Sequence, residues 1–211
     1  MMMQIRPAGP TALLVELADL DEVLALSAEV ARRRAGGWAP ELVDVVPGGR
    51  TLLLDGLADP AAVADQLAGW TVPPVPATAG ELVEIACCYD GPDLADVAEQ
   101  WGTTPEEVGQ RHASMPHTVA FCGFSPGFAY LAGLDAAHAV SRRRTPRTMV
   151  PAGSVAVGGP YTGIYPRPSP GGWQLIGRTD AVLWDTDRDP AALLRPGCRV
   201  RFVPVSSVEQ P

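Results

Sequence analysis

A ten-residue stretch without hydrophobic periodicity, residues 71–80, divides the chain and limits what it can fold into. It reads TVPPVPATAG, and this density of proline and glycine supports neither a helix nor a central strand. Periodic patterns are present on both sides of it, so we expect a linker between two domains. In a chain of 211 residues, the predicted domains cover residues 1–75 and 81–211.

The segment before this break has the pattern of a small sheet covered by helices. The expected elements are a strand pair or bent strand at 4–17, a helix at 21–34, a hairpin of strands at 42–46 and 51–54, a helix from 60 to about 70, and then a further strand. Asp59 is the expected N-cap of the second helix, with Pro60 at its first position. This order predicts a ferredoxin-like α/β sandwich.

After the break the pattern changes to short strands separated by glycine and proline. A strand at 81–89 precedes two short helices, which begin at Asp93 and at Thr104, where Glu107 completes a capping box. Six further strands are expected at 117–124, 154–158, 163–165, 173–177, 182–184 and 199–205. Short strands with glycine-bearing loops are typical of a closed or nearly closed β-barrel, so the predicted class is α+β.

The composition excludes several kinds of chemistry. All 16 basic residues are arginine, so the chain lacks the lysine that a P-loop, a protein kinase or a Schiff-base enzyme needs. Three histidines without a ligand-spaced pair of carboxylates predict no metal centre.

The cysteines and the uncharged stretches favour a cytoplasmic protein. Cys87 and Cys88 are adjacent in a predicted strand, so they face opposite ways, and no C-x-x-C occurs; we therefore expect reduced thiols. Charged residues occur early, which argues against a signal peptide. The longest uncharged stretch, residues 113–134, contains two prolines and three glycines, so no membrane span is expected.

Charge is unevenly distributed along a chain of net charge −8. Residues 1–140 hold 6 arginines and 19 acidic residues, whereas residues 141–211 hold 10 arginines and 5 acidic residues. This asymmetry predicts an anionic ligand or acidic partner near the C-terminal segment, or else arginines that are solvated on strand surfaces. Nucleic acid is not expected, because the helix-turn-helix-like segment 93–112 carries Glu106 and Glu107 where phosphates would lie.

Two local features have both a chemical and a structural interpretation. Residues 123–127, GFSPG, match the G-x-S-x-G nucleophile elbow, but Pro126 lacks the backbone N–H that the oxyanion hole needs, so we predict a proline-fixed loop. His112 lies four residues after Val108, on the same helical face. It is either a hydrogen-bonded structural histidine or a general acid/base that points into the barrel mouth.

Aromatic residues are concentrated in one part of the chain. Seven of the 13 fall within residues 121–173, interleaved with Gly-Pro loops and with Arg144, Arg147 and Arg167. Aromatic walls, accessible glycine backbone and a few arginines describe a concave site for a small molecule or a nucleotide. The same residues are equally consistent with a barrel core and irregular loops.

A series of motifs in the second domain resembles a known family. In order, these are GF-x-PGF-x-YL from Gly123, TPR from Thr145, VPAGSV from Val150, TGIYP from Thr162 and SPGGW-x-x-IGRT from Ser169. They are similar to the family of allophanate hydrolase subunit 1, which includes the B subunit of prokaryotic 5-oxoprolinase and the sporulation kinase inhibitor KipI. The first domain matches in layout more than in residues.

The resemblance implies a fold, partners and an activity. The fold is an N-terminal ferredoxin-like α/β domain followed by a C-terminal cyclophilin-like β-barrel. The implied partners are a homologous C subunit, similar to allophanate hydrolase subunit 2, and an A subunit. Together the three cleave the lactam 5-oxoproline to glutamate at the expense of ATP. Two alternatives stay open: a KipI-like inhibitor of a histidine kinase, and the carboxyltransferase half of a urea carboxylase or allophanate hydrolase type system.

Roles for individual residues are hypotheses within this resemblance. Phosphorylation would turn the lactam carbonyl oxygen into a good leaving group, and arginine must supply the cations for ATP, with Mg²⁺ as a further candidate. His112 and Arg147 are the expected catalytic residues, for proton transfer and anion contact. Residues expected to bind substrate or anion are Phe124, Pro126, Gly127, Phe128, Gly153, Ser154, Tyr165, Gly171, Gly172, Trp173 and Arg178. His117 and Tyr161 replace the family's usual Tyr and Gln, so specificity differs if they touch substrate.

Overall fold

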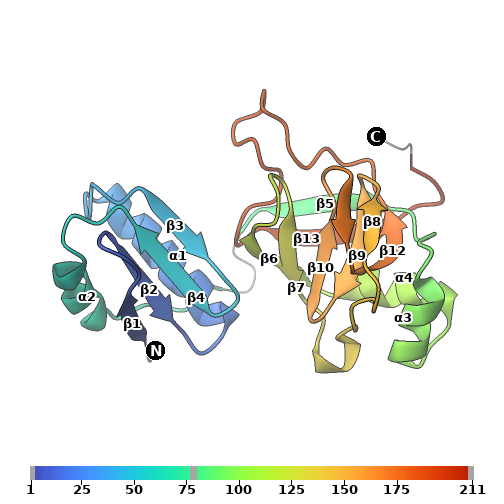
Figure 1. Ribbon diagram of the computed structural model, residues 1–211, viewed down its shortest axis with the longest axis horizontal. Coiled ribbons are helices and arrows are strands. Elements are labelled where there is room, and N and C mark those ends of the chain that lie inside the picture. The colour runs from blue at the N-terminus through green and yellow to red at the C-terminus, as the bar shows by residue number, and fades with distance from the viewer. Residues whose placement is uncertain (1–2, 77–79, 209–211) are drawn as a thin grey trace. The chain divides into compact units, whose positions relative to one another are not determined.

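Residues 3–76 and 80–208 are described by the computed structural model, in which the chain divides into two units, residues 1–79 and 80–211 (Figure 1). The expected linker at 71–80 has no helix or strand over residues 71–76, and its residues 77–79 lie outside the described part.

The first unit is a four-stranded antiparallel sheet with two helices packed on it. Its order is β1-β2-β4-β3, and its elements are β1 (Gln4–Pro7), β2 (Ala12–Glu16), α1 (Leu20–Ala35), β3 (Asp44–Pro47), β4 (Thr51–Asp55) and α2 (Pro60–Ala68). Asp19 and Asp59 cap the helices through backbone N–H groups at Glu22 and Ala62. Alternate residues of β2 and β4 face the helices and form the core with them.

The strand expected after the second helix is wrong. Residues 69–76 contain no strand, and β1 occupies the sheet edge beside β2 where that strand would pair. The strand pair predicted at 4–17 supplies this edge instead, since β1 and β2 form a hairpin with Gln4 opposite Glu16. The edge is therefore filled from the N-terminal side of the unit.

The second unit is built on a seven-stranded sheet that almost closes into a barrel. Its order is β12-β9-β10-β7-β6-β13-β5, with the elements β5 (Leu82–Cys87), β6 (His117–Cys122), β7 (Ala129–Ala132), β9 (Ser154–Gly158), β10 (Tyr161–Ile164), β12 (Gln174–Arg178) and β13 (Arg199–Pro204). Only the β13–β5 pair of this sheet is parallel. Cys88, just after β5, exchanges two backbone hydrogen bonds of 2.9 Å with Arg178 at the end of β12, which brings the two outer strands together.

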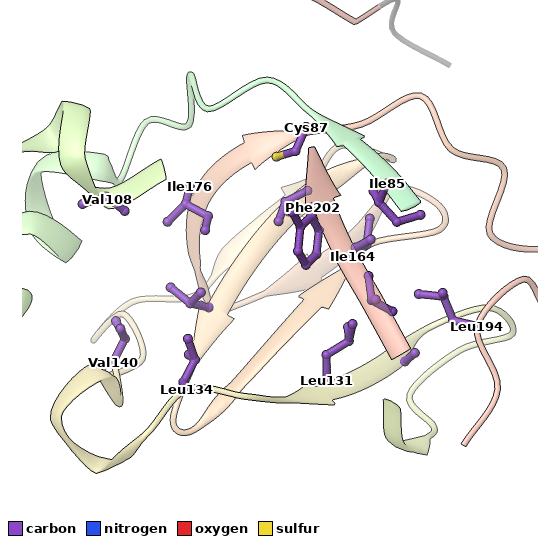
Figure 2. Packing of buried hydrophobic residues seen from close by; sticks show 14 of the residues in the cluster. Ile85, Cys87, Val108, Leu131, Leu134, Val140, Ile164, Ile176, Leu194 and Phe202 are labelled. Atoms are coloured by element: carbon purple, nitrogen blue, oxygen red, sulfur yellow. The ribbon is translucent and has the colours of Figure 1, made fainter. Parts of the chain in front are cut away.

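Apolar side chains fill the barrel. Figure 2 shows Leu131, Ile164 and Ile176 around Phe202, whose ring is buried at the centre. Two helices, α3 (Leu94–Trp101) and α4 (Pro105–Ser114), pack on β12 and β13 at one end of the barrel, and Val108 of α4 belongs to the same core. A separate ribbon, β8 (Arg147–Val150) with β11 (Ser169–Gly171), completes the unit, together with the short 3-10 helix η1 (Ala136–His138).

Several details differ from the sequence prediction. Residues 182–184 form no strand; Trp184 makes only an isolated bridge with Ala192, and the side chains of Val182 and Trp184 are exposed. Strands β7, β8 and β11 were not predicted. The capping box at Thr104 is half formed: its hydroxyl accepts from the Glu107 N–H, but the Glu107 carboxylate accepts from the Thr103 hydroxyl.

Candidate functional site

Tyr165, which directly follows β10, lies at the centre of the residues that the sequence assigned to binding. Its N–H donates to the carbonyl of Ser154, and its own carbonyl accepts from the N–H of Gly153 at 2.8 Å. A Cβ at Gly171 would collide with the Tyr165 hydroxyl, so glycine is required where the ring passes under the β8–β11 ribbon. Arg147 is the strand partner of Gly171.

Aromatic rings cover the outside of the barrel around Tyr165. The Phe128 ring lies 5.3 Å from Tyr165 and 5.8 Å from Trp173, centre to centre, and Tyr130 lies 5.6 Å from Trp173. We call Phe128, Tyr130, Tyr161, Tyr165 and Trp173 the outer aromatic cluster. It is separate from the barrel core because alternate strand residues face opposite ways: in β9, Val155 and Val157 point inward and Ala156 points outward.

The loop before β7 adds an exposed ring to this cluster. Phe124 has a left-handed backbone (φ +66°), and the Ser125 N–H donates to the Gly123 carbonyl across it at 2.7 Å, as in a strained γ-turn. Its ring is 57% exposed and lies 5.2 Å from that of Phe128. Gly127 (φ +84°) lets the loop pack on Trp184, where a Cβ would be 2.8 Å from the tryptophan Cβ. Strain of this kind concentrates at functional loops.

A buried ion-pair group lies at the arginine-rich side of the cluster. The Asp93 carboxylate is almost fully buried and accepts from Arg147 Nη1 and Nη2 and from Arg143 Nη1, each at 2.8 Å, and from the Leu175 N–H at 2.7 Å. Burial alone would raise the pKa of Asp93, but the Arg147 and Leu175 hydrogen bonds outweigh it and hold that pKa below its usual value. Arg147 therefore serves mainly as the ion-pair partner of Asp93, and only the N–H groups that do not bind Asp93 are available to a ligand.

His112 lies inside the barrel. Its side chain is fully buried; Nδ1 is 2.8 Å from the Tyr89 hydroxyl and Nε2 is 2.9 Å from Thr162 Oγ1. Burial, reinforced by the neighbouring His117, holds the pKa of His112 well below its usual value, so the ring is neutral. The expectation that it points into the barrel mouth is wrong, because α4 turns this face toward the Phe202 ring, 4.7 Å away. The geometry is that of the structural histidine.

Arg178 stabilises the place where β12 meets the end of β5 and closes the barrel. Its Nε donates to Asp90 at 2.9 Å and its Nη1 to the carbonyl of Val208 at 2.8 Å. Arg178 therefore lies apart from the Asp93 ion-pair group. The backbone of Gly172 belongs to that group, because the Gly172 carbonyl accepts a hydrogen bond from the Arg143 N–H at 2.8 Å.

The two residues that depart from the family pattern occupy different places. His117 is buried in the barrel and its Nε2 donates to the His112 carbonyl at 3.0 Å. Tyr161 is half-buried in the outer aromatic cluster.

Sequence reasoning missed three contributors to this region. Asp93 was expected only as the residue at which a helix begins, yet its buried side chain forms ion pairs with two arginines. Arg143 and Arg142 were not singled out, although the run of three arginines before Thr145 is plain in the sequence. The Arg142 guanidinium lies 5.9 Å from the centre of the Trp173 ring.

Metal ligands and membrane spans were sought in the same residues, 3–76 and 80–208. No three His, Cys, Asp or Glu side chains gather there in a way that would hold a metal ion. Across that part of the chain, every helix is too short or too polar to cross a membrane. All four cysteines are free thiols.

Comparison with known proteins places these features in a family. The carboxyltransferase domain family, subdomain C and D, matches residues 3–194. The B subunit of 5-oxoprolinase from Escherichia coli O157:H7 is 51% identical over 126 residues, which are 58% of this chain and 58% of that protein. The corresponding B subunit from Haemophilus influenzae is 49% identical over 127 residues, 59% of this chain and 60% of that protein. The chain thus spans about three fifths of the curated relatives it matches.

Solved structures extend the likeness to the whole chain. The crystal structure of TTHA0988 is 34% identical, with a TM-score of 0.78 over 99% of this chain and 41% of that one. The urea amidolyase of K. lactis shares the fold, with a TM-score of 0.70 at 21% identity over 97% of this chain and 15% of that one.

Proposed function

Because the chain belongs to the carboxyltransferase domain family, subdomain C and D, we propose that it is the B subunit of an ATP-dependent 5-oxoprolinase. The complex would open the lactam of 5-oxoproline to glutamate. The observation that carries the proposal is the 51% identity to the B subunit of a 5-oxoprolinase over 126 residues. The finer assignment of the two units, ferredoxin-like and cyclophilin-like, is part of the same proposal and is supported by the β2-α1-β3-β4-α2 order and the nearly closed barrel.

The chemistry of a lactam explains why ATP is needed. A five-membered amide is stable, and transfer of a phosphoryl group to its carbonyl oxygen creates a better leaving group. Phosphoryl transfer asks the protein mainly for position and positive charge. In this chain Arg142, Arg143 and Arg147 place positive charge beside the outer aromatic cluster, at the end of the site that meets the anionic substrate. No step is assigned to Mg²⁺, for which the described residues offer no ligand cluster.

His112 takes the structural role in this proposal. Both of its ring nitrogens are occupied by Tyr89 and Thr162, and no part of the side chain is exposed, so it holds α4 to the barrel wall. Proton transfer then falls to groups of the assembled complex.

Partner subunits are proposed because the relatives are larger. This chain covers only 41% of TTHA0988 and 15% of the urea amidolyase of K. lactis. We propose that a homologous C subunit, similar to allophanate hydrolase subunit 2, supplies the corresponding remainder as a separate chain, and that an A subunit completes the enzyme in the cytoplasm. The exposed Phe124 ring lies at the edge of the site where such a partner would close it.

Reconstitution tests the proposal. The chain is co-expressed with the neighbouring open reading frames, purified as a complex and assayed for release of ADP and glutamate. We expect ATP hydrolysis only with 5-oxoproline, and none from the isolated chain. Inhibition of a sensor kinase's autophosphorylation would favour the KipI-like alternative, and a biotinylated partner on a streptavidin blot would favour the urea carboxylase type; either result without lactam-dependent turnover contradicts the proposal.

A further inference from the structure

The segment that leads into β8 carries more positive charge than the structure neutralises. Residues 142–147 read RRRTPR, so four arginines fall within six residues. The buried Asp93 pairs with two of them, Arg143 and Arg147. Arg142 and Arg144 are exposed and form no ion pair with any residue in the described ranges. The local excess of cationic groups attracts an oxyanion.

Asp93 holds the positive charge of Arg143 and Arg147 in place but neutralises only part of it. Its two oxygens accept four hydrogen bonds, three from guanidinium N–H groups and one from the Leu175 N–H. A guanidinium has five N–H donors. Arg147 therefore keeps donors for a ligand, while its plane is held by a carboxylate that is itself locked to β12. Such support is what gives a binding group a defined direction.

Residues 171–173 bring further groups to the same place. The Arg143 N–H donates to the Gly172 carbonyl, and Arg147 is the partner of Gly171 in the β8–β11 ribbon. The Arg142 guanidinium lies 5.9 Å from the centre of the Trp173 ring. The Tyr165 hydroxyl lies directly against Gly171. Burial raises the pKa of Tyr165, and Arg142 and Arg147 are close enough to oppose that rise, so the hydroxyl keeps its proton and can donate it.

We propose that Arg142, Arg147 and the Tyr165 hydroxyl form an oxyanion subsite beside the Trp173 ring, and that it holds the carboxylate of 5-oxoproline while the lactam ring lies toward the outer aromatic cluster. The assignment to this substrate rests on the proposed function. A guanidinium pair with a phenolic donor binds a carboxylate or a phosphate group by the same hydrogen bonds.

The experiment compares 5-oxoproline with 2-pyrrolidinone, the same lactam without the carboxylate, in the reconstituted complex. Arg142→Gln is expected to raise the KM for 5-oxoproline about 10- to 100-fold, as for loss of a charged hydrogen bond, and to leave the KM for ATP unchanged. The preference for 5-oxoproline over 2-pyrrolidinone falls by the same factor. Arg111→Gln is the control, because that partly exposed arginine lies on α4 and, among the described residues, forms an ion pair with Glu107 alone. A raised KM for ATP, or no change in either KM, overturns the proposal.

A second measurement separates this inference from the proposed function. If the wild-type complex shows no lactam-dependent turnover, the function fails, and the subsite is tested by NMR titration of the full chain. Amide shifts at Gly171, Gly172 and Trp173 with 5-oxoproline, absent with 2-pyrrolidinone and lost in Arg142→Gln, support it. The inference is overturned if inorganic phosphate shifts these amides and 5-oxoproline does not, or if 5-oxoproline shifts none of them.

Discussion

The two histidines inside the barrel predict that the second unit loses stability in mild acid. Each ring nitrogen of His112 already has a hydroxyl partner, Tyr89 at Nδ1 and Thr162 at Nε2, and neither partner carries a negative charge. His117 donates from Nε2 to the His112 carbonyl, which leaves Nδ1 as an acceptor without a partner among the described residues. A second proton on either ring would be a buried charge with no counter-ion.

The sign and the size of this loss of stability follow from the linkage between proton binding and folding. Burial is the main reason that the pKa of each histidine lies below its ordinary value of 6.5. Above pH 6.5 the folded and unfolded states bind the same protons there; below it the unfolded chain takes up two that the barrel excludes. The free energy of unfolding then falls by about 1.4 kcal/mol per pH unit for each histidine. Between pH 7.5 and 5.5 we expect a loss of about 2 to 3 kcal/mol.

Urea denaturation at several pH values measures this slope. Replacing Trp38 and Trp70 by Phe removes the tryptophans of the first unit, so fluorescence reports the second unit alone. His117→Gln should reduce the slope by about half.

The carboxylates titrate at lower pH and do not confuse the result, because unfolded Asp and Glu have pKa values of about 4. An unfolding free energy that is equal at pH 7.5 and 5.5 would refute the reasoning. So would a slope that His117→Gln leaves unchanged.

Three further changes test other parts of the structure. Asp93→Asn leaves two arginines without their buried carboxylate and should cost about 3–5 kcal/mol in urea denaturation. Phe124→Asn relieves the left-handed strain and should raise stability by up to about 1 kcal/mol while lowering turnover of the complex; unchanged turnover would show that the exposed ring is dispensable. Gly177→Ala places a Cβ 2.5 Å from the Cys88 carbonyl and should open the barrel closure, seen as fast hydrogen exchange at the Arg178 amide.

Elements with strong local signals could be predicted from the sequence. Helices α2 and α4 begin directly after their predicted caps, Asp59 and Thr104, and α1 begins one residue before its predicted start at residue 21. Strand β9 matches its prediction residue for residue, because a continuous apolar run ends at a glycine. Strands β7, β8 and β11 have only three or four residues and no alternation of apolar with polar residues, so the local sequence does not mark them as strands.

The site could be predicted only as a collection of residues. The motifs around Tyr165 do gather, because the strands that carry them are adjacent in the sheet. Arg147 pairs with Asp93, which lies 54 positions earlier. Tertiary packing sets this pair, so no local pattern in the sequence predicts it. Helical spacing places His112 on the face toward the barrel, but whether that face meets the mouth or the interior depends on how the sheet closes.

The parallel pairing of β5 with β13 has a consequence for synthesis in the cell. Leu82 pairs with Arg199, so the first strand of the second unit must wait for its only partner strand in the sheet until more than a hundred further residues have left the ribosome. The strands of the first unit find their partners within a few dozen residues, so that unit can fold while translation continues. Until then the nascent second unit presents an unpaired strand that bears valine and isoleucine side chains, which exposes it to aggregation during synthesis.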